Sequence, residues 1–244
     1  GKIALITGAT RGIGKQISDD LEAANIQELI LTGTNDEEIT RLNQLNPSGC
    51  CKRNYITVDL SDEASFSEFQ EILKTFPQID ICINNAAVNN PKPIRGTSYA
   101  DWDKAYSVNL KSIFFITQLV AEKMIANNYG RIVNISSIYS LISRPGRSLY
   151  TSTKSGLNGL TISSSLELAG NNVLVNSVSP GFVLTDLTKN NLTQGEQKEL
   201  ATKIPVGRLA ETGDISSAVL FLSSELNTYI TGHNLVVDGG YTNA

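Results

Sequence analysis

Apolar residues in this chain come in short runs, separated by longer stretches in which apolar and polar positions recur with helical spacing. A continuous apolar run bounded by turn residues is typical of a strand buried on both faces. The longer stretches predict helices at about residues 12–25, 37–46, 62–75, 99–127, 148–169 and 211–223. The runs predict strands at residues 3–7, 29–32, 55–58, 79–83, 131–135, 173–178 and 234–237.

This alternation of strands and helices predicts an α/β fold. The expected form is a doubly wound, mostly seven-stranded parallel sheet with helices on both faces, which is a Rossmann-like arrangement. Glycines and prolines are dispersed, and the 244 residues contain no repeat or linker, so we expect one domain over residues 1–244. The polar segment at about 182–208 follows a strand end and breaks the rhythm. Ligands bind beyond the carboxyl ends of such strands, so we expect this segment to act as a substrate lid.

A glycine-rich segment, TGATRGIG at residues 7–14, joins the first predicted strand to the first predicted helix. Glycines allow a tight turn and a close approach to a pyrophosphate, and the helix N-terminus supplies free N–H donors. The glycine spacing is not the commoner G-x-G-x-x-G, and an ordinary glycine-rich turn is the alternative. The position between a strand and a helix favours a dinucleotide site.

Other unusual segments also follow strand ends. They are Asn84-Asn-Ala-Ala87 after the fourth strand, Asn134-Ile-Ser-Ser137 after the fifth, and Asn176-Ser-Val-Ser-Pro-Gly181 at the sixth, with Thr185 just beyond. Because the carboxyl ends of parallel strands meet at one edge of a sheet, we expect these segments to lie close together.

A tyrosine and a lysine begin the next predicted helix. Tyr150 follows Ser137 by thirteen residues, and Lys154 comes one helical turn later on the same face. Alone, this pair also fits a lysine lying along a half-buried tyrosine.

Together these segments resemble the short-chain dehydrogenase/reductase family, in its short single-domain members, over residues 2–241. Matching features include Asn109 in Val108-Asn-Leu110, Tyr150 with Lys154, and the terminal Asp238-Gly-Gly240. Ala87 stands where glycine is usual, which matters only if that residue needs a positive φ. Residues 206–208 and 229–232 are also similar to the 3-oxoacyl-carrier-protein reductases of this family.

The resemblance implies hydride transfer between a nicotinamide cofactor and a ketone or secondary alcohol, with a 3-oxoacyl thioester as the expected substrate. It also implies a role for each matching residue. The catalytic residues would be Ser137, Tyr150, Lys154 and Asn109. The cofactor would be bound by Gly8, Thr10, Arg11, Gly12, Ile13, Gly14, Thr34, Asp59, Asn85, Ala86, Tyr150, Lys154, Pro180, Gly181 and Thr185.

Ketone reduction needs a proton donor at the developing alkoxide, and Tyr150 would serve, with Ser137 sharing the oxyanion. A free phenol has a pKa of about 10, and bringing it to about 7 requires roughly 4 kcal/mol. One ammonium at about 4 Å supplies about that much at an effective dielectric near 20. We therefore expect Lys154 to make Tyr150 acidic. By resemblance, Lys154 also binds the nicotinamide ribose, and Asn109 holds a water that relays protons.

Cofactor choice depends on the end of the second strand, where an acid selects NAD and a cation selects NADP. Gly33, Thr34 and Asn35 are neutral, and Arg11 is available for a 2′-phosphate. These residues favour NADP over NAD, although Asp36 lies close enough to leave NAD open.

The sequence says less about the substrate than about the cofactor. Asn128 and Asn171 stand where carrier-protein reductases have basic residues for an acidic carrier. Arg144 and Arg147, just before Tyr150, would suit a carboxylate or phosphate, or are simply exposed loop arginines. The alternative function is an NAD-dependent sugar or polyol dehydrogenase of the same family.

Other function classes are disfavoured. A serine hydrolase would need a G-x-S-x-G turn, which is missing, and the chain has one histidine, His233. A non-catalytic NADP sensor would keep the glycine segment while losing Tyr150 and Lys154.

Composition and charge limit the classes of partner that the protein could bind. A net charge of −4 with scattered Lys and Arg disfavours nucleic acid and anionic membranes as partners. Without a signal peptide or a transmembrane-length run, we expect a cytoplasmic location. Cys50, Cys51 and Cys82 predict reduced structural thiols and no metal site. The helices at 99–127 and 148–169 carry more apolar residues than one buried face needs, which predicts a homotetramer or at least a dimer.

Overall fold

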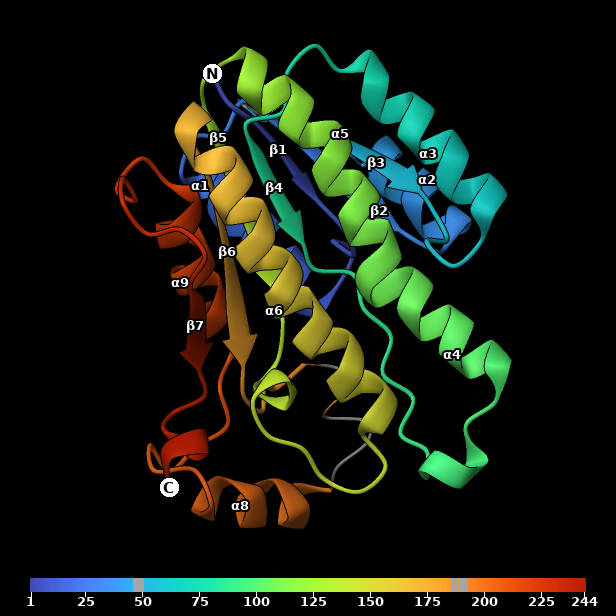
Figure 1. Ribbon diagram of the computed structural model, residues 1–244, viewed down its shortest axis with the longest axis vertical. Helices are drawn as coiled ribbons and strands as arrows, with labels where there is room; N and C mark the ends of the chain where they lie inside the picture. The colour runs from blue at the N-terminus through green and yellow to red at the C-terminus, as the bar shows by residue number, and fades with distance from the viewer. Residues whose placement is uncertain (46–50, 186–187, 189–192) are drawn as a thin grey trace.

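The sheet is parallel throughout and confirms the predicted doubly wound α/β fold (Figure 1). The computed structural model describes residues 1–45, 51–185, 188 and 193–244. Within these residues, seven strands follow the order β3-β2-β1-β4-β5-β6-β7. They are β1 (Ile3–Ile6), β2 (Glu28–Gly33), β3 (Lys52–Thr57), β4 (Ile81–Asn84), β5 (Gly130–Ile135), β6 (Val173–Pro180) and β7 (Asn234–Val237).

Helices cover both faces of the sheet, with α5 and α6 crossing in front and α1 and α9 behind (Figure 1). Leu5 faces the core under α3 and α5, whereas its neighbour Ile6 faces the core under α1 and α9. Both faces are buried, which is why the strands read as continuous apolar runs. None of the described helices is long and apolar enough to cross a membrane. The α-helices are α1 (Gly12–Ala23), α2 (Asp36–Gln44), α3 (Glu63–Thr75), α4 (Tyr99–Tyr106), α5 (Ser112–Ala126), α6 (Ser148–Leu168), α8 (Gln194–Thr202) and α9 (Thr212–Ser223).

The helix predicted at 99–127 is confirmed, with one irregular turn inside it. A π-helical turn, η2 (Ser107–Lys111), separates α4 from α5 and contains Asn109. Such turns insert one residue into a helix and occur often at functional sites. An apolar pattern does not reveal a single inserted residue, so the sequence predicted the helix but not its π-helical turn.

The segment predicted as a lid is only partly described, because residues 186–187 and 189–192 lie outside the described residues, as does Cys50. Its two ends are held together by an isolated parallel bridge between Val183 and Ala210. Helix α8 was not predicted, although Thr193 and Glu196 form a capping box at its start. That Thr-x-x-Glu spacing is the signal that sequence reasoning overlooked.

The strand order reverses between β1 and β4, because β2 lies on one side of β1 and β4 on the other. Helices leaving the two strands then cover opposite faces, which opens a crevice at the carboxyl ends. This crevice positions the candidate site.

Candidate active site

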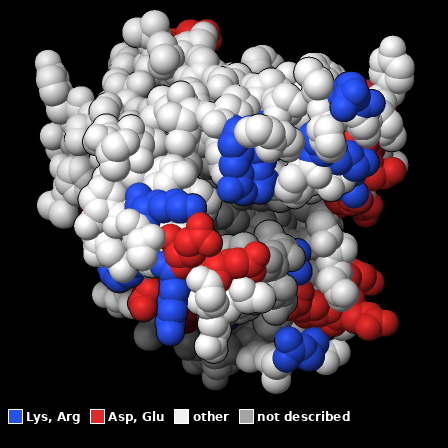
Figure 2. All heavy atoms as spheres, turned by 90° about the horizontal axis from the view of Figure 1, so that it is seen from below, with Lys and Arg blue, Asp and Glu red and all other residues white. Residues whose placement is uncertain are grey.

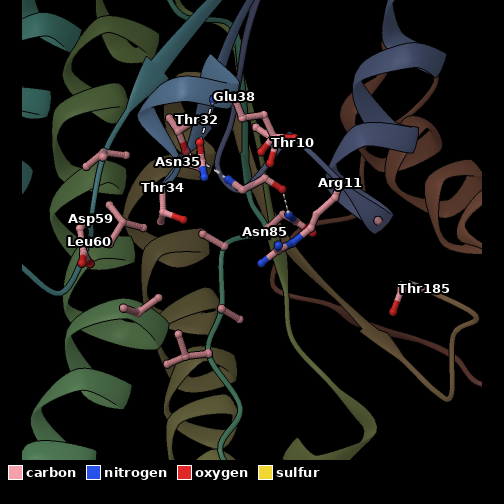
Figure 3. A pocket seen from close by; sticks show the side chains of 18 of the residues that line it. Thr10, Arg11, Thr32, Thr34, Asn35, Glu38, Asp59, Leu60, Asn85 and Thr185 are labelled. Atoms are coloured by element: carbon pink, nitrogen blue, oxygen red, sulfur yellow. Dashed lines mark hydrogen bonds between the residues drawn. The ribbon is translucent and has the colours of Figure 1, made fainter. Parts of the chain in front are cut away.

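A cavity of about 490 Å³ lies at the carboxyl ends of β1 to β4 (Figure 3). It joins segments that are far apart in sequence, as expected for a ligand site at this reversal point. Nine of the predicted cofactor residues line it, namely Gly8, Thr10, Arg11, Gly12, Thr34, Asp59, Asn85, Ala86 and Thr185.

The turn after β1 is shaped for close approach of a ligand to its backbone. A side chain on Gly14 would collide with the Gly8 carbonyl oxygen and lie 2.5 Å from Asn85 Nδ2. Arg11 is the N-cap of α1, yet its side chain makes no capping hydrogen bond. The N–H groups of Gly12 and Ile13 have no acceptor within the described parts of the chain. Free donors at a helix N-terminus beside a glycine turn fit the diphosphate of a dinucleotide.

Two threonines that sequence reasoning did not single out hold this turn. Thr7 Oγ1 accepts the N–H groups of Asn85 and Ala86, each at 3.0 Å. Thr32 Oγ1 accepts the Gly8 N–H at 3.1 Å. Each threonine stands at the end of an apolar run, and this position in the sequence could have identified both as residues of the site.

The departure at Ala87 has no structural cost. Ala87 lines the cavity and is not among the positive-φ residues of the described chain. Alanine therefore fits where the family usually has glycine.

The far end of the cavity carries the residues that distinguish NADP from NAD. The Asp36 carboxylate accepts a hydrogen bond from Thr57 Oγ1 at 2.8 Å, which directs it toward β3. The acid that lines this end of the cavity in place of Asp36 is Glu38, which was not predicted. Figure 3 shows the Arg11 side chain reaching into the same cavity, with Thr34 on the opposite side.

Asp59, another of the predicted cofactor residues, also lines the cavity. Its carboxylate accepts hydrogen bonds from Ser61 Oγ at 2.6 Å and from Ser61 N at 2.8 Å. These bonds hold the pKa of Asp59 below its usual value. Asp59 therefore presents a fixed negative charge at this wall.

The predicted catalytic residues form a cluster beside this cavity but do not line it. Ser137 follows β5, and its side chain lies near enough to the Tyr150 phenol to act on the pKa of that phenol. Lys154 is fully buried, and its Nζ lies 5.7 Å from the centre of the Tyr150 ring. Hydroxyl, phenol and ammonium thus meet at the carboxyl end of β5.

The electrostatics of this cluster differ from the prediction. Burial raises the pKa of Tyr150 to about 12, although the nearby Ser137 hydroxyl and the Arg147 charge act in the opposite direction. Burial lowers the pKa of Lys154 to about 7, and its Nζ donates to the Ile135 carbonyl oxygen at 2.7 Å. The prediction that Lys154 makes Tyr150 acidic is therefore wrong for this arrangement. Sequence reasoning recognised the pair but not the depth at which both groups lie.

The Asn109 side chain is buried and binds protein groups. Its Oδ1 accepts the Val88 N–H at 2.8 Å, and its Nδ2 donates to the Val88 carbonyl and Thr153 Oγ1. Both amide hydrogens are used, so the side chain ties the segment after β4 to α6. One lone pair of the amide oxygen is left for a water.

The other predicted cofactor residues lie near the cavity rather than in its wall. Ile13 packs into the core, and Gly14 lies under Gly8. Pro180 ends β6, and Gly181 packs so closely on Asp238 that a Cβ would lie 2.8 Å from it.

Two further sequence expectations concern carriers and metals. Asn128 and Asn171 precede β5 and β6, at the amino ends of the strands, so they do not lie at the mouth of this cavity. In the described ranges, no group of three His, Cys, Asp or Glu residues could hold a metal ion.

Fold, glycine turn and the Ser137–Tyr150–Lys154 cluster define the class: the chain belongs to the short-chain dehydrogenase/reductase family. A family profile described as enoyl-(acyl carrier protein) reductase matches residues 8–242. The chain is 40% identical over 243 residues to the 3-oxoacyl-(acyl-carrier-protein) reductase FabG of Aquifex aeolicus strain VF5, covering 98% of this chain and 97% of the relative.

Solved structures agree with this assignment. The structure of ElxO with NADP bound is 31% identical with a TM-score of 0.90, covering 100% of this chain and 99% of the other. A gluconate 5-dehydrogenase from Burkholderia cenocepacia J2315, in complex with NADP and tartrate, is 29% identical with a TM-score of 0.91, at 100% and 96% coverage.

Proposed function

We propose that the protein is an NADPH-dependent oxidoreductase that reduces a ketone to a secondary alcohol, with a 3-oxoacyl thioester as the reference substrate. The observation that carries the proposal is the cluster of Ser137, Tyr150 and the buried Lys154 at the carboxyl end of β5, beside the cavity at the β1–β4 crevice. Carbonyl reduction by a dinucleotide needs hydroxyl groups near the cofactor that donate hydrogen bonds and a proton to the carbonyl oxygen.

In the mechanism, Ser137 and Tyr150 donate hydrogen bonds to one substrate carbonyl oxygen. Bound NADPH supplies the hydride to the carbonyl carbon. Tyr150 gives its proton to the oxygen as negative charge develops there, and Ser137 stabilises that charge. Lys154 stands behind Tyr150 with a pKa lowered by burial to about 7, so it can return a proton to the phenolate near neutral pH.

NADP is favoured over NAD by the wall of the cavity. Arg11, Thr34 and Asn35 line it, and the nearest acid along the chain, Asp36, is bonded to Thr57. Arginine binds a 2′-phosphate with charge-assisted hydrogen bonds. The bound NADP in ElxO and in the gluconate 5-dehydrogenase also supports this choice.

The likeness to FabG supports a 3-oxoacyl substrate rather than an enoyl one. Two donors on one oxygen suit a carbonyl that becomes a hydroxyl, whereas an enoyl reduction leaves that oxygen as a carbonyl. A sugar or polyol dehydrogenase is the second candidate, favoured by the likeness to the gluconate 5-dehydrogenase.

The test measures NADPH and NADH oxidation with acetoacetyl and crotonyl thioesters, and NADP and NAD reduction with gluconate. We expect NADPH-dependent reduction of the acetoacetyl thioester and its loss in Tyr150→Phe. Activity confined to the crotonyl thioester, or to gluconate with NAD, would overturn the proposal in favour of the corresponding alternative.

A homotetramer, or a dimer, through α5 and α6 is part of the proposal. Phe114 and Phe115 on α5 are 49% and 36% exposed, and Ile162 and Leu166 on α6 are 53% and 80% exposed. Their neighbours Ile113, Ile116, Leu119, Val120 and Leu157 are buried in the core. The apolar residues of these helices therefore divide between the core and a free face, and a second copy would cover the free face.

A further inference from the structure

Two arginines lie close to the catalytic tyrosine, in the loop between β5 and α6. The guanidinium carbons of Arg144 and Arg147 lie 5.6 and 5.4 Å from the centre of the Tyr139 ring. The Tyr139 ring in turn meets the Tyr150 ring edge to face, with centres 6.3 Å apart. The two cations are therefore one aromatic ring away from the proton donor.

The loop that carries them is fixed by its own contacts. Ser143 Oγ hydrogen-bonds Thr151 Oγ1 on α6 at 2.8 Å. Gly146 adopts a positive φ of 78°, which favours glycine, and its carbonyl oxygen accepts the Lys92 N–H at 3.1 Å. Arg147 Nη1 donates to Asn89 Oδ1 at 2.6 Å. The Arg147 guanidinium is thus held by Asn89, and contacts on both sides fix the loop that carries Arg144.

Neither arginine has an acidic partner in the part of the chain that the structure describes, where ion pairs are made by other side chains. Two like charges over one ring repel each other, although the chain has a net charge of −4. The Tyr139 hydroxyl is buried, with no hydrogen-bond partner among the described residues. Figure 2 shows the face at the carboxyl ends of the strands, where side chains of both charges, Lys and Arg as well as Asp and Glu, border a hollow.

We infer that the substrate carries an oxyanion, a carboxylate or a phosphate, a few bonds from its reacting carbonyl, and that Arg144 and Arg147 bind it. This inference rests on the proposed carbonyl reduction: the 3-oxoacyl thioester is the reference ketone there, and the inference names the class of ketone that the site prefers to it. The arginines match an oxyanion because a guanidinium offers paired N–H donors to two oxygens. The short distance through Tyr139 requires the anion to belong to the substrate itself, since the phosphate of a carrier-bound thioester lies at the far end of a long arm.

Matched ketones test the inference. One pair is 4-oxopentanoate and its methyl ester, and the other is hydroxyacetone phosphate and hydroxyacetone. We expect the wild type to favour the anion in kcat/KM. Arg144→Gln and Arg147→Gln should each lower that preference by about ten-fold or more, the effect of losing one charge-assisted hydrogen bond. The pair with the larger preference identifies the anion as carboxylate or phosphate.

Two control variants separate charge from structure. Lys74→Gln removes one positive charge at the end of α3, where Lys74 pairs with Glu71, and should leave the preference unchanged. Arg147→Lys keeps the charge near Tyr150 and should retain part of the preference. An equal loss for the anionic and neutral ketones in Arg147→Gln would overturn the inference, because Arg147 would then act on Tyr150 and not on the substrate.

Calorimetric measurement of ketone binding tests the anion site independently of the proposed reaction. With NADP present, 4-oxopentanoate should bind at least about ten-fold more tightly than its methyl ester, and Arg144→Gln should remove the difference. Equal binding of acid and ester refutes the anion site, even if ketones are reduced. Tight anion binding without reduction of any ketone refutes the proposed reaction and leaves the anion site standing.

Discussion

Replacing Lys154 with methionine should stabilise the fold at neutral and acidic pH while abolishing turnover. Lys154 is fully buried, and burial lowers its pKa from 10.5 to about 7. Methionine fills a similar volume without a charge. The variant therefore removes the cost of keeping an ammonium away from water.

The magnitude follows from the pKa shift. A pKa lowered from 10.5 to about 7 corresponds to roughly 5 kcal/mol that the charged lysine takes from the folded state. Loss of the hydrogen bond to the Ile135 carbonyl returns about 1–3 kcal/mol of that gain. A net stabilisation of about 2–4 kcal/mol below pH 7 remains.

The lowered pKa of Lys154 also determines how the stability difference between the two proteins changes with pH. Below pH 7 the lysine is protonated in both states, so the full penalty is present in the wild type. Between about pH 7 and 10.5 the folded state releases the proton first, the unfolded state binds more protons, and wild-type stability rises with pH. The advantage of Lys154→Met should therefore shrink by about 1.4 kcal/mol per pH unit across this range.

Urea denaturation of the wild type and of Lys154→Met at pH 6 and pH 9 measures this change. The difference in the free energy of unfolding should fall by about 3 kcal/mol between the two pH values. Lys74→Met, which removes an exposed lysine, serves as the control and should show no such change. A difference for Lys154→Met that is the same at both pH values would refute the reasoning.

Tyr150→Phe should retain cofactor binding, measured by fluorescence titration, and lose turnover by orders of magnitude, since it removes only the proton donor; turnover within a few-fold of the wild type contradicts its role. Arg11→Ala should raise the dissociation constant for NADPH by about ten-fold or more and hardly change that for NADH. Equal losses for both cofactors would mean that Arg11 binds the shared diphosphate. Leu166→Lys, which charges the 80% exposed position on α6, should lower the mass measured by light scattering at micromolar protein. Ser163→Lys, which adds the same charge at another exposed position of this helix, is the control. An unchanged mass for Leu166→Lys would exclude this face from the assembly.

Sequence reasoning was most successful where strands end. Buried parallel strands are continuous apolar runs, and the polar or glycine-rich residues after them stand out. Gly8, Asn85 and Thr34 were therefore placed correctly at one edge, although Gly8 and Asn85 are more than seventy residues apart. Parallel topology makes such convergence predictable without side-chain coordinates.

The features that the sequence did not predict depend on how deeply a side chain is buried and on which neighbour it contacts. Spacing placed Tyr150 beside Lys154 but did not reveal how deeply the lysine is buried, and this burial lowers its pKa to about 7. Glu38 rather than Asp36 lines the cavity, because Asp36 finds a partner on the neighbouring strand. Such choices are set by which side chain meets a tertiary partner, and periodicity carries no information about that.

The pairing of β1 with β4 has a consequence for biosynthesis. Ala4 is aligned with Ile81, so the inner edge of β1 stays open until the ribosome has released the first third of the chain. Until then β1, β2 and β3 can pair, but one side of β1 exposes unpaired N–H and C=O groups that invite pairing with another nascent chain. The crevice forms in the same event, but β4 then presents an open edge of its own until β5 joins it. Dinucleotide affinity in a pulse-labelled translation product should therefore arise only after β4 has emerged, while the growing edge of the sheet is still exposed.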